Sequence, residues 1–294
     1  MGAETVKRMR GVEALVGPAF RRFGSATSTW RGSPEMLLVG TQRGGTTSLF
    51  RALRQHPGFV GPSHRKGVHY YDVEYHRGRA WYLGHFPTRR SLDALAARLG
   101  YPPVVGEASP YYLAHPLAAR RFAADLPDVK VIAMLRDPIE RAYSAHAHER
   151  ARGYESREFA EAVSDEPRWV EQETALILAD DGYRSERHRH HAYLTRGHYV
   201  DQLIAIEDLI GRERMLVVDS ARYFARPETE FSRVLQFLEL PEHGDIRHDR
   251  HNARPRSPLP GDLQGALEEH FEPYDRRLAS WLGWEPSWRS DRRP

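Results

Sequence analysis

The chain of 294 residues contains no cysteine, so disulfide bonds and cysteine-ligated metal sites are excluded. A small secreted domain held together by disulfides is excluded for the same reason, and we expect a cytoplasmic protein. No apolar run approaches the roughly 18 residues that a membrane-spanning helix requires. Val6 stands where an N-terminal myristoylation signal requires serine or threonine, so we expect no lipid anchor.

Lysine is also scarce, because only Lys7, Lys66 and Lys130 occur among the 43 lysine and arginine residues. The formal net charge is +3 and the pI is about 9.1. An evenly mixed basic surface of this kind fits an anionic cofactor or substrate. It does not require nucleic acid, and we find no RNA- or DNA-binding motif. The hydrophobic content of 40% is enough for one core, and one large α/β domain is expected.

The stretch MLLVGTQRGGTTSLFR, from Met36 to Arg51, has the pattern of a strand, a glycine-rich turn and a helix. This arrangement predicts an anion site, because unpaired N–H groups and the helix dipole are directed at the ligand. Gly44 and Gly45 let the backbone approach closely, and Arg43 adds a permanent cation. The residues predicted to bind the anion are Gln42, Arg43, Gly44, Gly45, Thr46, Thr47 and Ser48.

The spacing from Gly40 to Gly45 is similar to a P-loop, but Thr46 stands where the P-loop has lysine. That lysine serves the phosphates of a nucleoside triphosphate, so its absence argues against an ATPase or a kinase. We also find no apolar strand that ends in an aspartate placed to hold Mg²⁺. The turn therefore predicts a phosphate or sulfate donor used without a metal ion.

A second motif, VIAMLRDPIERAYSAHAHER, runs from Val131 to Arg150. A buried strand should deliver Arg136 to its carboxyl end, where open α/β sheets bind ligands. Pro138 suits the first turn of a helix, and Ser144 lies two turns further on. Arg136 and Ser144 can both face one phosphate, as a bidentate cation and a hydroxyl.

These two segments resemble sulfotransferases that use 3′-phosphoadenosine 5′-phosphosulfate (PAPS), most closely the carbohydrate branch of heparan sulfate type and its bacterial relatives. TQRGGTTSL is similar to the family's 5′-phosphosulfate-binding loop, and RDPIERAYS to its 3′-phosphate-binding segment. The resemblance implies that Arg136 and Ser144 hold the 3′-phosphate. The family commonly has lysine where Arg43 stands. Arginine keeps the charge but not a proton-donating role, because it stays protonated.

The segment KGVHYYD, from Lys66 to Asp72, resembles the family's K-E-x-H-F-F-D, whose glutamate is the usual catalytic base. Gly67 occupies that position here and cannot take a proton from the acceptor. His69 is then the leading candidate for the base, and Glu107 in GEASP is the other. Lys66 is expected to contact the transferring sulfuryl group or the leaving phosphate. The candidate catalytic residues are His69, Lys66, Arg43 and Glu107.

Four tyrosines in these segments can either stack on a sugar ring or aromatic acceptor, or pack in the core; they are Tyr70, Tyr71, Tyr111 and Tyr112. The run from His188 to His191 lacks an acidic or cysteine partner, so we interpret it as a solvated basic face and not as a metal site. Late segments around Arg196 and around Asn252, Arg254 and Arg256 resemble family segments that close over cofactor or acceptor.

The order of elements predicts a P-loop-like α/β domain with a parallel sheet of about five strands flanked by helices. Strands are expected at 36–40, 59–60, 103–106, 129–135 and 215–218. Helices are expected at 46–53, 79–86, 92–99, 136–150, 199–210, 227–240 and 263–282, with polar helical character at 155–195. The predicted boundaries are a loose N-terminal arm at 1–34, with apolar positions 12, 15, 16 and 20, a domain at 35–284 and a C-terminal tail at 285–294.

We therefore predict a PAPS-dependent sulfotransferase that acts on a hydroxyl or amine of a carbohydrate or other small acceptor. Two alternatives stay open. One is a catalytically inactive binder of PAPS or anionic glycan, suggested by Gly67. The other is a P-loop kinase of small molecules, which Thr46 disfavours. Sugars, lipids and aromatic natural products all remain possible acceptors, and the oligomeric state is open.

Overall fold

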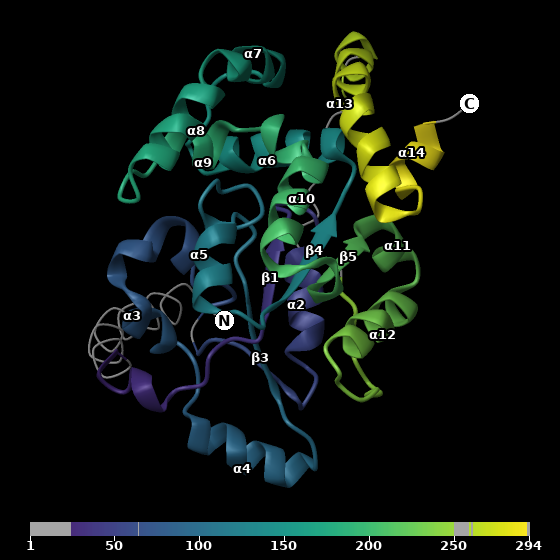
Figure 1. Cartoon of the computed structure of the whole chain (residues 1–294). Helices are drawn as coiled ribbons and strands as arrows, with labels where there is room; N and C mark the ends of the chain where they lie inside the picture. Colours follow the sequence, from purple (N-terminus) through teal and green to yellow (C-terminus); the bar gives the residue numbers. More distant parts are fainter. Residues whose placement is uncertain (1–24, 64, 250–258, 260, 293–294) are drawn as a thin grey trace, which may run out of the picture.

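The computed structural model describes residues 25–63, 65–249, 259 and 261–292, which form a sheet covered by helices on both faces (Figure 1). All five strands of the sheet are parallel, in the order β2-β3-β1-β4-β5. Their bounds are β1 Met36–Gly40, β2 Phe59–Val60, β3 Val104–Ala108, β4 Lys130–Leu135 and β5 Met215–Asp219. The predicted fold class and the number of strands are confirmed.

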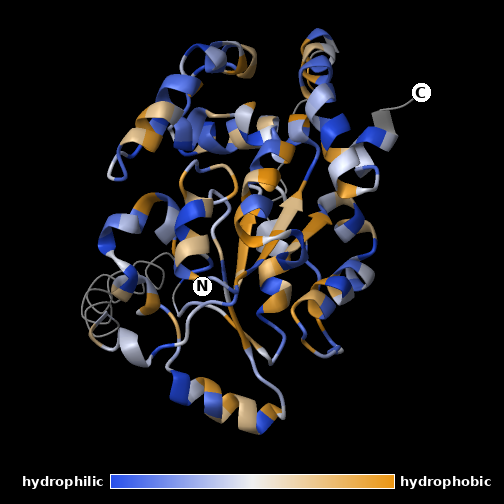
Figure 2. Ribbon diagram, viewed as in Figure 1, coloured by the Kyte–Doolittle hydropathy of each residue, from blue (hydrophilic) through white to orange (hydrophobic). Residues whose placement is uncertain are grey.

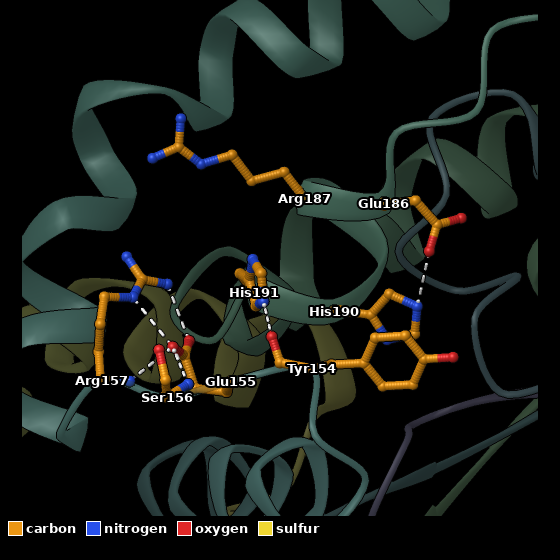
Figure 3. A pocket seen from close by; sticks show the side chains of 8 residues that line it. All are labelled: Tyr154, Glu155, Ser156, Arg157, Glu186, Arg187, His190 and His191. Atoms are coloured by element: carbon orange, nitrogen blue, oxygen red, sulfur yellow. Dashed lines mark hydrogen bonds and ion pairs between the residues drawn. The ribbon is translucent and has the colours of Figure 1, made fainter.

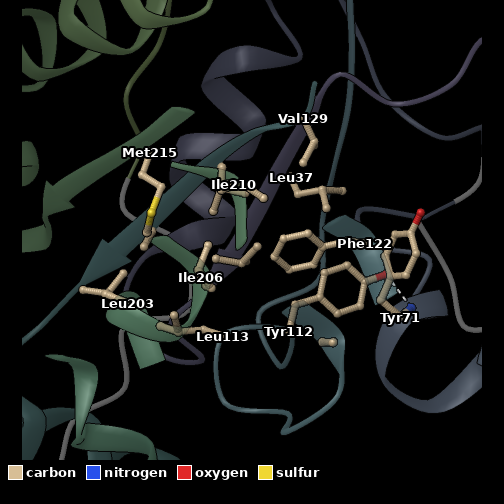
Figure 4. Close-up of a cluster of buried hydrophobic side chains, with 14 of the residues drawn as sticks. Leu37, Tyr71, Tyr112, Leu113, Phe122, Val129, Leu203, Ile206, Ile210 and Met215 are labelled. Carbon is tan, nitrogen blue, oxygen red and sulfur yellow. Dashed lines mark hydrogen bonds between the residues drawn. The ribbon is translucent and has the colours of Figure 1, made fainter. Parts of the chain in front are cut away.

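The central strand β1 is buried along its whole length, because it supplies side chains to both faces of the sheet. Leu37 and Val39 pack with α5 (Ala118–Asp125) and α10 (Tyr199–Ile210) in the cluster of Figure 4. Met36 and Leu38 pack on the other face, with α2 (Thr46–Leu53) and α12 (Pro227–Phe237). The apolar colour of the strands in Figure 2 reflects this burial on both faces.

The neighbouring strands β1 and β4 form the switch point of the sheet. β1 leads through α2 to β2 on one side, whereas β4 leads through α6 (Pro138–Ala151) toward β5 on the other. Ligands of open α/β sheets bind where the connections diverge in this way, outside the carboxyl ends of the strands. The two predicted anion-binding segments follow β1 and β4 directly, so the topology brings them side by side.

The remaining helices lie around this edge and at the far end of the sheet. A helical lobe rises above the carboxyl ends in Figure 1, and α4 lies below the opposite end. The lobe contains α7 (Phe159–Asp165), α8 (Val170–Ala179) and α9 (Glu186–His191), in agreement with the predicted helical character of 155–195. The other α-helices are α3 Arg79–Leu83, α4 Arg89–Leu99, α11 Ser220–Ala225, α13 Gly261–Leu282 and α14 Ser287–Arg292. The short 3₁₀ and π segments are η1 Ser28–Trp30, η2 Tyr70–Glu74, η3 Tyr75–Arg77, η4 Glu166–Arg168, η5 Thr195–Gly197 and η6 Arg212–Arg214.

Several element boundaries differ from those predicted. β3 continues to Ala108, and α12 ends at Phe237 instead of residue 240. α11 was not predicted, because its six residues are too few for a helical period to be visible. Its start is marked by Asp219, whose side chain accepts hydrogen bonds from Ala221 N and Arg222 N at 2.9 and 3.2 Å. β5 extends one residue beyond the predicted strand, to Asp219, and the side chain of this residue caps α11.

Both predicted extensions are at least partly packed on the domain. In the C-terminal tail, α14 buries Trp288, which is 4% exposed and lies in the same cluster as Leu37. In the N-terminal arm, Arg31 is buried and donates a hydrogen bond to Phe86 O at 2.5 Å. The apolar positions at 12, 15, 16 and 20 lie outside the described residues. Within the described ranges, the helices are too short or too polar to cross a membrane.

Candidate active site

The turn after β1 requires both of its glycines. A Cβ atom on Gly44 would lie 2.7 Å from Met134 O of β4, and Gly45 has a φ of +98°. Thr41 N donates to the same carbonyl of Met134 at 2.7 Å, so the turn is held against β4. α2 begins at Thr46, and the first N–H groups of any α-helix have no acceptor within it. The turn therefore presents backbone donors at the carboxyl edge of the sheet.

The two segments predicted to bind anions contact each other. Arg43 Nε donates to Ser144 Oγ at 3.0 Å, across from the turn to α6. Arg136 donates to Arg43 O at 3.4 Å and forms an ion pair with Glu140 Oε2 at 2.9 Å. Tyr199 OH donates to Arg136 O at 2.9 Å, which fixes the backbone after β4. The structure thus links Arg43 of the turn to Ser144 of α6 and to Arg136 after β4.

Lys66 reaches the glycine-rich turn from another part of the chain. Its Nζ donates to Thr46 Oγ1 at 2.7 Å and to Thr47 Oγ1 at 3.3 Å. The ammonium group therefore lies beside the residue that replaces the P-loop lysine. Burial, and secondly the charge of Arg51, lower the pKa of Lys66 to about 7. An anion bound at the turn would favour the protonated form of this side chain.

Gly67 lies where a side chain has no room. A Cβ atom there would be 2.2 Å from Ala108 O and 2.6 Å from Ser109 Oγ. The backbone is held at this point by a hydrogen bond of 3.0 Å from Ala108 N to Lys66 O. The segment from Lys66 to Asp72 is thus packed against the end of β3 in a way that only glycine permits at position 67.

His69 and Asp72 form a hydrogen-bonded pair, with 2.8 Å between His69 Nδ1 and Asp72 Oδ2. Asp72 is buried, whereas the His69 side chain is 36% exposed. Burial lowers the pKa of His69, but the carboxylates of Asp72 and, secondly, Glu107 together raise it by more, so the net shift is upward. The pair assigns the proton of neutral His69 to Nδ1, and Nε2 is then the nitrogen that can accept a proton. The role of Asp72 was not predicted from the sequence.

Glu107 lies beneath the same segment, completely buried at the end of β3. Its carboxylate accepts hydrogen bonds from Val68 N at 2.6 Å, Ser109 Oγ at 2.7 Å, Tyr112 OH at 2.8 Å and Tyr82 OH at 3.0 Å. Burial raises the pKa of Glu107, although these donors oppose the shift. The fold thus brings Glu107 near His69, which its assignment as the catalytic base requires. However, four donors surround the Glu107 carboxylate, and the side chain is not exposed to an acceptor.

The four tyrosines that were candidates for acceptor stacking are core residues. Tyr70, Tyr71, Tyr111 and Tyr112 are all buried, and Tyr71 and Tyr112 appear within the packed cluster of Figure 4. Of the two roles that the sequence left open, stacking on the acceptor and packing in the core, their burial favours packing in the core.

The interpretation of the run from His188 to His191 as a solvated basic face was wrong for two of its members. His188 is 2% exposed and His190 is 6% exposed. His188 Nδ1 lies 2.7 Å from Tyr111 OH, and burial lowers the pKa of His188 to about 3. These imidazoles are packed because α9 lies against α6. Among the described residues, no group of three histidine, aspartate or glutamate side chains is arranged to hold a metal ion.

A hydrogen-bond chain that the sequence did not predict links the turn to the helical lobe. Gln42 Nε2 donates to Glu149 Oε1 at 3.3 Å, and His190 Nδ1 lies 2.9 Å from Glu149 Oε2. Arg196 contacts Gln42 Oε1 and lies over the Tyr111 ring at 4.5 Å. The sequence had indicated a link between Arg196 and the site only through the resemblance of its segment to a family segment. Residues 252, 254 and 256, which share that resemblance, lie outside the described residues.

The lobe also carries an open groove of about 470 Å³, and His190 is one of the residues that line it (Figure 3). His190 stacks on Tyr154 with 4.1 Å between ring centroids. The charged groups of the groove are largely paired, as Arg157 is with Glu155 at 2.8 Å. The residues that line the groove are Tyr154, Glu155, Ser156, Arg157, Glu186, Arg187, His190 and His191.

The family model described as "Sulfotransferase domain" matches residues 33–254, and the chain belongs to this family. The recognition of a PAPS-dependent sulfotransferase family from the sequence is thereby confirmed, together with the enzyme class, transferase. The solved structure of a sulfotransferase from Alicyclobacillus acidocaldarius is similar, with a TM-score of 0.66 and 26% identity over 88% of this chain and 99% of that one.

Curated relatives cover different shares of the chain. The human heparan sulfate glucosamine 3-O-sulfotransferase 6 is 26% identical over 95% of this chain and 77% of its own length. The human bifunctional heparan sulfate N-deacetylase/N-sulfotransferase 2 is 29% identical over 70% of this chain. The membrane-associated sulfotransferase kil1 of Dictyostelium discoideum is 34% identical over 38% of this chain. The chain spans only 22% of the length of each of the latter two.

The packing around position 67 generates a testable prediction. Gly67→Ala should lower the free energy of unfolding by roughly 1–3 kcal/mol, the usual cost of overpacking, because the new methyl meets backbone atoms of Ala108. Urea denaturation measures this change. Gly265→Ala is the control, because its Cβ would have no neighbour within 4 Å and alanine favours the helix by up to about 1 kcal/mol. Equal stability of the two variants would contradict the packing argument.

Proposed function

We propose that this protein transfers a sulfuryl group from PAPS to a hydroxyl or amine of an acceptor. The observation that carries the proposal is the convergence of two separate anion-binding segments, in which Arg43 of the glycine turn donates to Ser144 of α6 at 3.0 Å. A nucleotide with phosphate groups at both its 5′ and 3′ positions requires two such sites at a fixed separation. Membership of the sulfotransferase family supports the same donor.

The residues around the turn fit the charges of PAPS. The backbone donors of the turn, Arg43 and Lys66 would hold the 5′-phosphosulfate, whereas Arg136 and Ser144 would hold the 3′-phosphate. PAPS supplies the activated sulfuryl group when it is bound. The contribution of the chain is positioning and charge: Lys66 and Arg43 place two cations where negative charge grows on the leaving phosphate.

The proton of the acceptor would pass to His69 Nε2. Asp72 holds Nδ1 and stabilises the imidazolium that forms, which is the arrangement of a general base with an orienting carboxylate. Glu107 is a weaker candidate, because its carboxylate is buried and already accepts four hydrogen bonds. The His69–Asp72 pair also disfavours the alternative of a catalytically inactive binder, because the site has a candidate base although glycine replaces the family glutamate at position 67.

A carbohydrate acceptor is favoured because two of the relatives are a heparan sulfate glucosamine 3-O-sulfotransferase and a heparan sulfate N-deacetylase/N-sulfotransferase. A small-molecule kinase is disfavoured because Asp219, at the end of β5, is occupied by hydrogen bonds to the start of α11 and to Ser287 N at 2.9 Å. We also propose that the reaction needs no metal ion, because Thr46 replaces the P-loop lysine, and that the protein is cytoplasmic, because the chain contains no cysteine.

The test of the donor is direct. Calorimetry in the presence of EDTA should show tight binding of 3′-phosphoadenosine 5′-phosphate, and PAPS should be consumed with an acceptor panel that includes heparan-type oligosaccharides.

Arg136→Ala should weaken the binding of 3′-phosphoadenosine 5′-phosphate by about 2–4 kcal/mol, as for the loss of a charged phosphate partner, and Ser144→Ala by about 1 kcal/mol. Arg120→Ala, at an exposed position on α5, is the control and should bind normally. Preference for ATP, or a requirement for Mg²⁺, would overturn the proposal.

The lowered pKa of Lys66 predicts that the protein takes up a proton when it binds the nucleotide. At about pH 8 most Lys66 side chains are neutral, and a bound anion raises their pKa, so uptake should approach one proton. Calorimetry in buffers of different ionisation enthalpy measures this number. Lys66→Met should abolish the buffer dependence, and a dependence that persists in this variant would show that another group takes up the proton.

The base assignment predicts that His69→Ala lowers kcat by roughly 10²–10⁴-fold, with little effect on nucleotide affinity. Because the pKa of His69 is raised, kcat/KM should fall as the pH drops through a value above 6.5. Asp72→Asn should move this acid limb to lower pH, since burial alone lowers the pKa. Near-normal turnover of His69→Ala, together with an inactive Glu107→Gln, would assign the role to Glu107.

A further inference from the structure

Arg121 is a buried arginine that neither the family resemblance nor the predicted site includes. It lies on α5 and is 6% exposed. One terminal nitrogen of its guanidinium donates to Tyr71 O at 3.0 Å and to Asp72 O at 3.2 Å. The other donates to Asp181 O and to Asp181 Oδ1, both at 3.0 Å. The guanidinium also lies over the Tyr75 ring at 4.4 Å.

The first pair of contacts supports the turn that carries Asp72. This turn, η2, is π-helical, and His69 immediately before it has a φ of +58°. Both features are uncommon for ordinary residues, and they persist only where the surrounding structure fixes them. Arg121 supplies that constraint from one terminal nitrogen to the carbonyl groups of Tyr71 and Asp72, while its other terminal nitrogen holds Asp181. A lysine ammonium has a single nitrogen and cannot hold both sides in this way.

The second pair of contacts reaches the opposite wall of the site. Asp181 belongs to the loop between α8 and α9, and α9 carries Arg189, which is near enough to His69 to oppose its protonation. Arg184 of the same loop contacts His76 of η3, with 2.6 Å between NH2 and Nδ1. The loop before α9 is thus fastened to the segment that bears the proposed base at two points, one buried and one exposed.

We propose that Arg121 is a positioning residue that holds Asp72 against His69 and fixes the distance between this pair and α9. It touches no reacting atom and acts through the pair and through the loop. Among the residues that the structure describes, its one carboxylate partner is Asp181, which is 76% exposed, so the charge of Arg121 does not serve to neutralise a buried acid there. The inference rests on the proposed function and deepens it, because it concerns how the proposed base is held in the same site.

The first test measures the pKa of the His69 imidazole by NMR in the full chain, in the wild type and in Arg121→Lys and Arg121→Met. The charged groups that face His69 are Asp72 in its own turn, Glu107 from β3 and Arg189 from α9. Loss of the Asp72 contact should lower the pKa, whereas removal of a nearby cation alone should raise it. We expect a fall in both variants, and Arg120→Gln is the matched control for α5. An unchanged or higher pKa overturns the inference.

The second test uses kinetics. Arg121→Met should lower kcat by roughly 10- to 100-fold, the effect of a small misplacement of catalytic groups, but by less than about 3-fold when His69 is already alanine. An equal loss in both backgrounds would indicate general damage to the fold and overturn the inference. Asp181→Ala removes the Oδ1 contact but keeps the contacts of Arg121 with Asp181 O, Tyr71 and Asp72, so it should leave the pKa of His69 unchanged. A fall of this pKa in Asp181→Ala would overturn the assignment of the effect to the Tyr71 and Asp72 contacts.

The two tests separate the inference from the proposed function. If the wild type consumes no PAPS with any acceptor, the proposed function fails, but the pKa of His69 can still be measured. If the wild type is active and the pKa does not fall in the Arg121 variants, the inference fails while the proposed function stands.

Discussion

The buried carboxylate of Glu107 is the interaction on which the site depends. Burial of an ionised carboxylate is costly unless donors surround it, and here four donors come from three different stretches of the chain. The Glu107 carboxylate accepts hydrogen bonds from Val68 N and from Ser109 Oγ, and Ser109 Oγ in turn accepts one from His69 N at 3.0 Å. These bonds hold the segment around residue 68 against the end of β3. Lys66 lies on one side of this anchor and His69 on the other, so their positions depend on one buried charge.

The strand, turn and helix of each segment proposed to bind an anion could be predicted from the sequence because each pattern is local. A strand, a glycine turn and a helix occupy consecutive residues at Gly40–Ser48, and Arg136 directly follows the most apolar strand. The order of the strands then brings these two local signals together at the switch point. The parallel sheet could be predicted for a similar reason, since continuous apolar runs alternate with helical periods.

The rest of the site could not be predicted, because it depends on long-range contacts and on unusual local geometry. Glu107 looked like a candidate base, and nothing in its neighbourhood in the sequence indicates that Val68 N and Tyr82 OH, both distant along the chain, complete a set of four donors around it. The pairing of His69 with Asp72 follows from a π-helical turn, which has no recognisable period in five residues. His188 and His190 appeared solvated because a polar run usually is, but α9 packs these two imidazoles inward. Gly67 was interpreted as a loss, whereas the contact with Ala108 makes glycine the residue that fits.

The position of Lys66 has a consequence for the reactivity of the protein. A lysine whose pKa is about 7 is largely an unprotonated amine in mildly alkaline solution, and an unprotonated amine is a nucleophile. The chain contains only two other lysines, so a mild acylating reagent meets very few competing side chains. The amine beside the glycine-rich turn is therefore a selective site for chemical modification, and a bound anion, which stabilises the protonated form of Lys66, would protect it from the reagent.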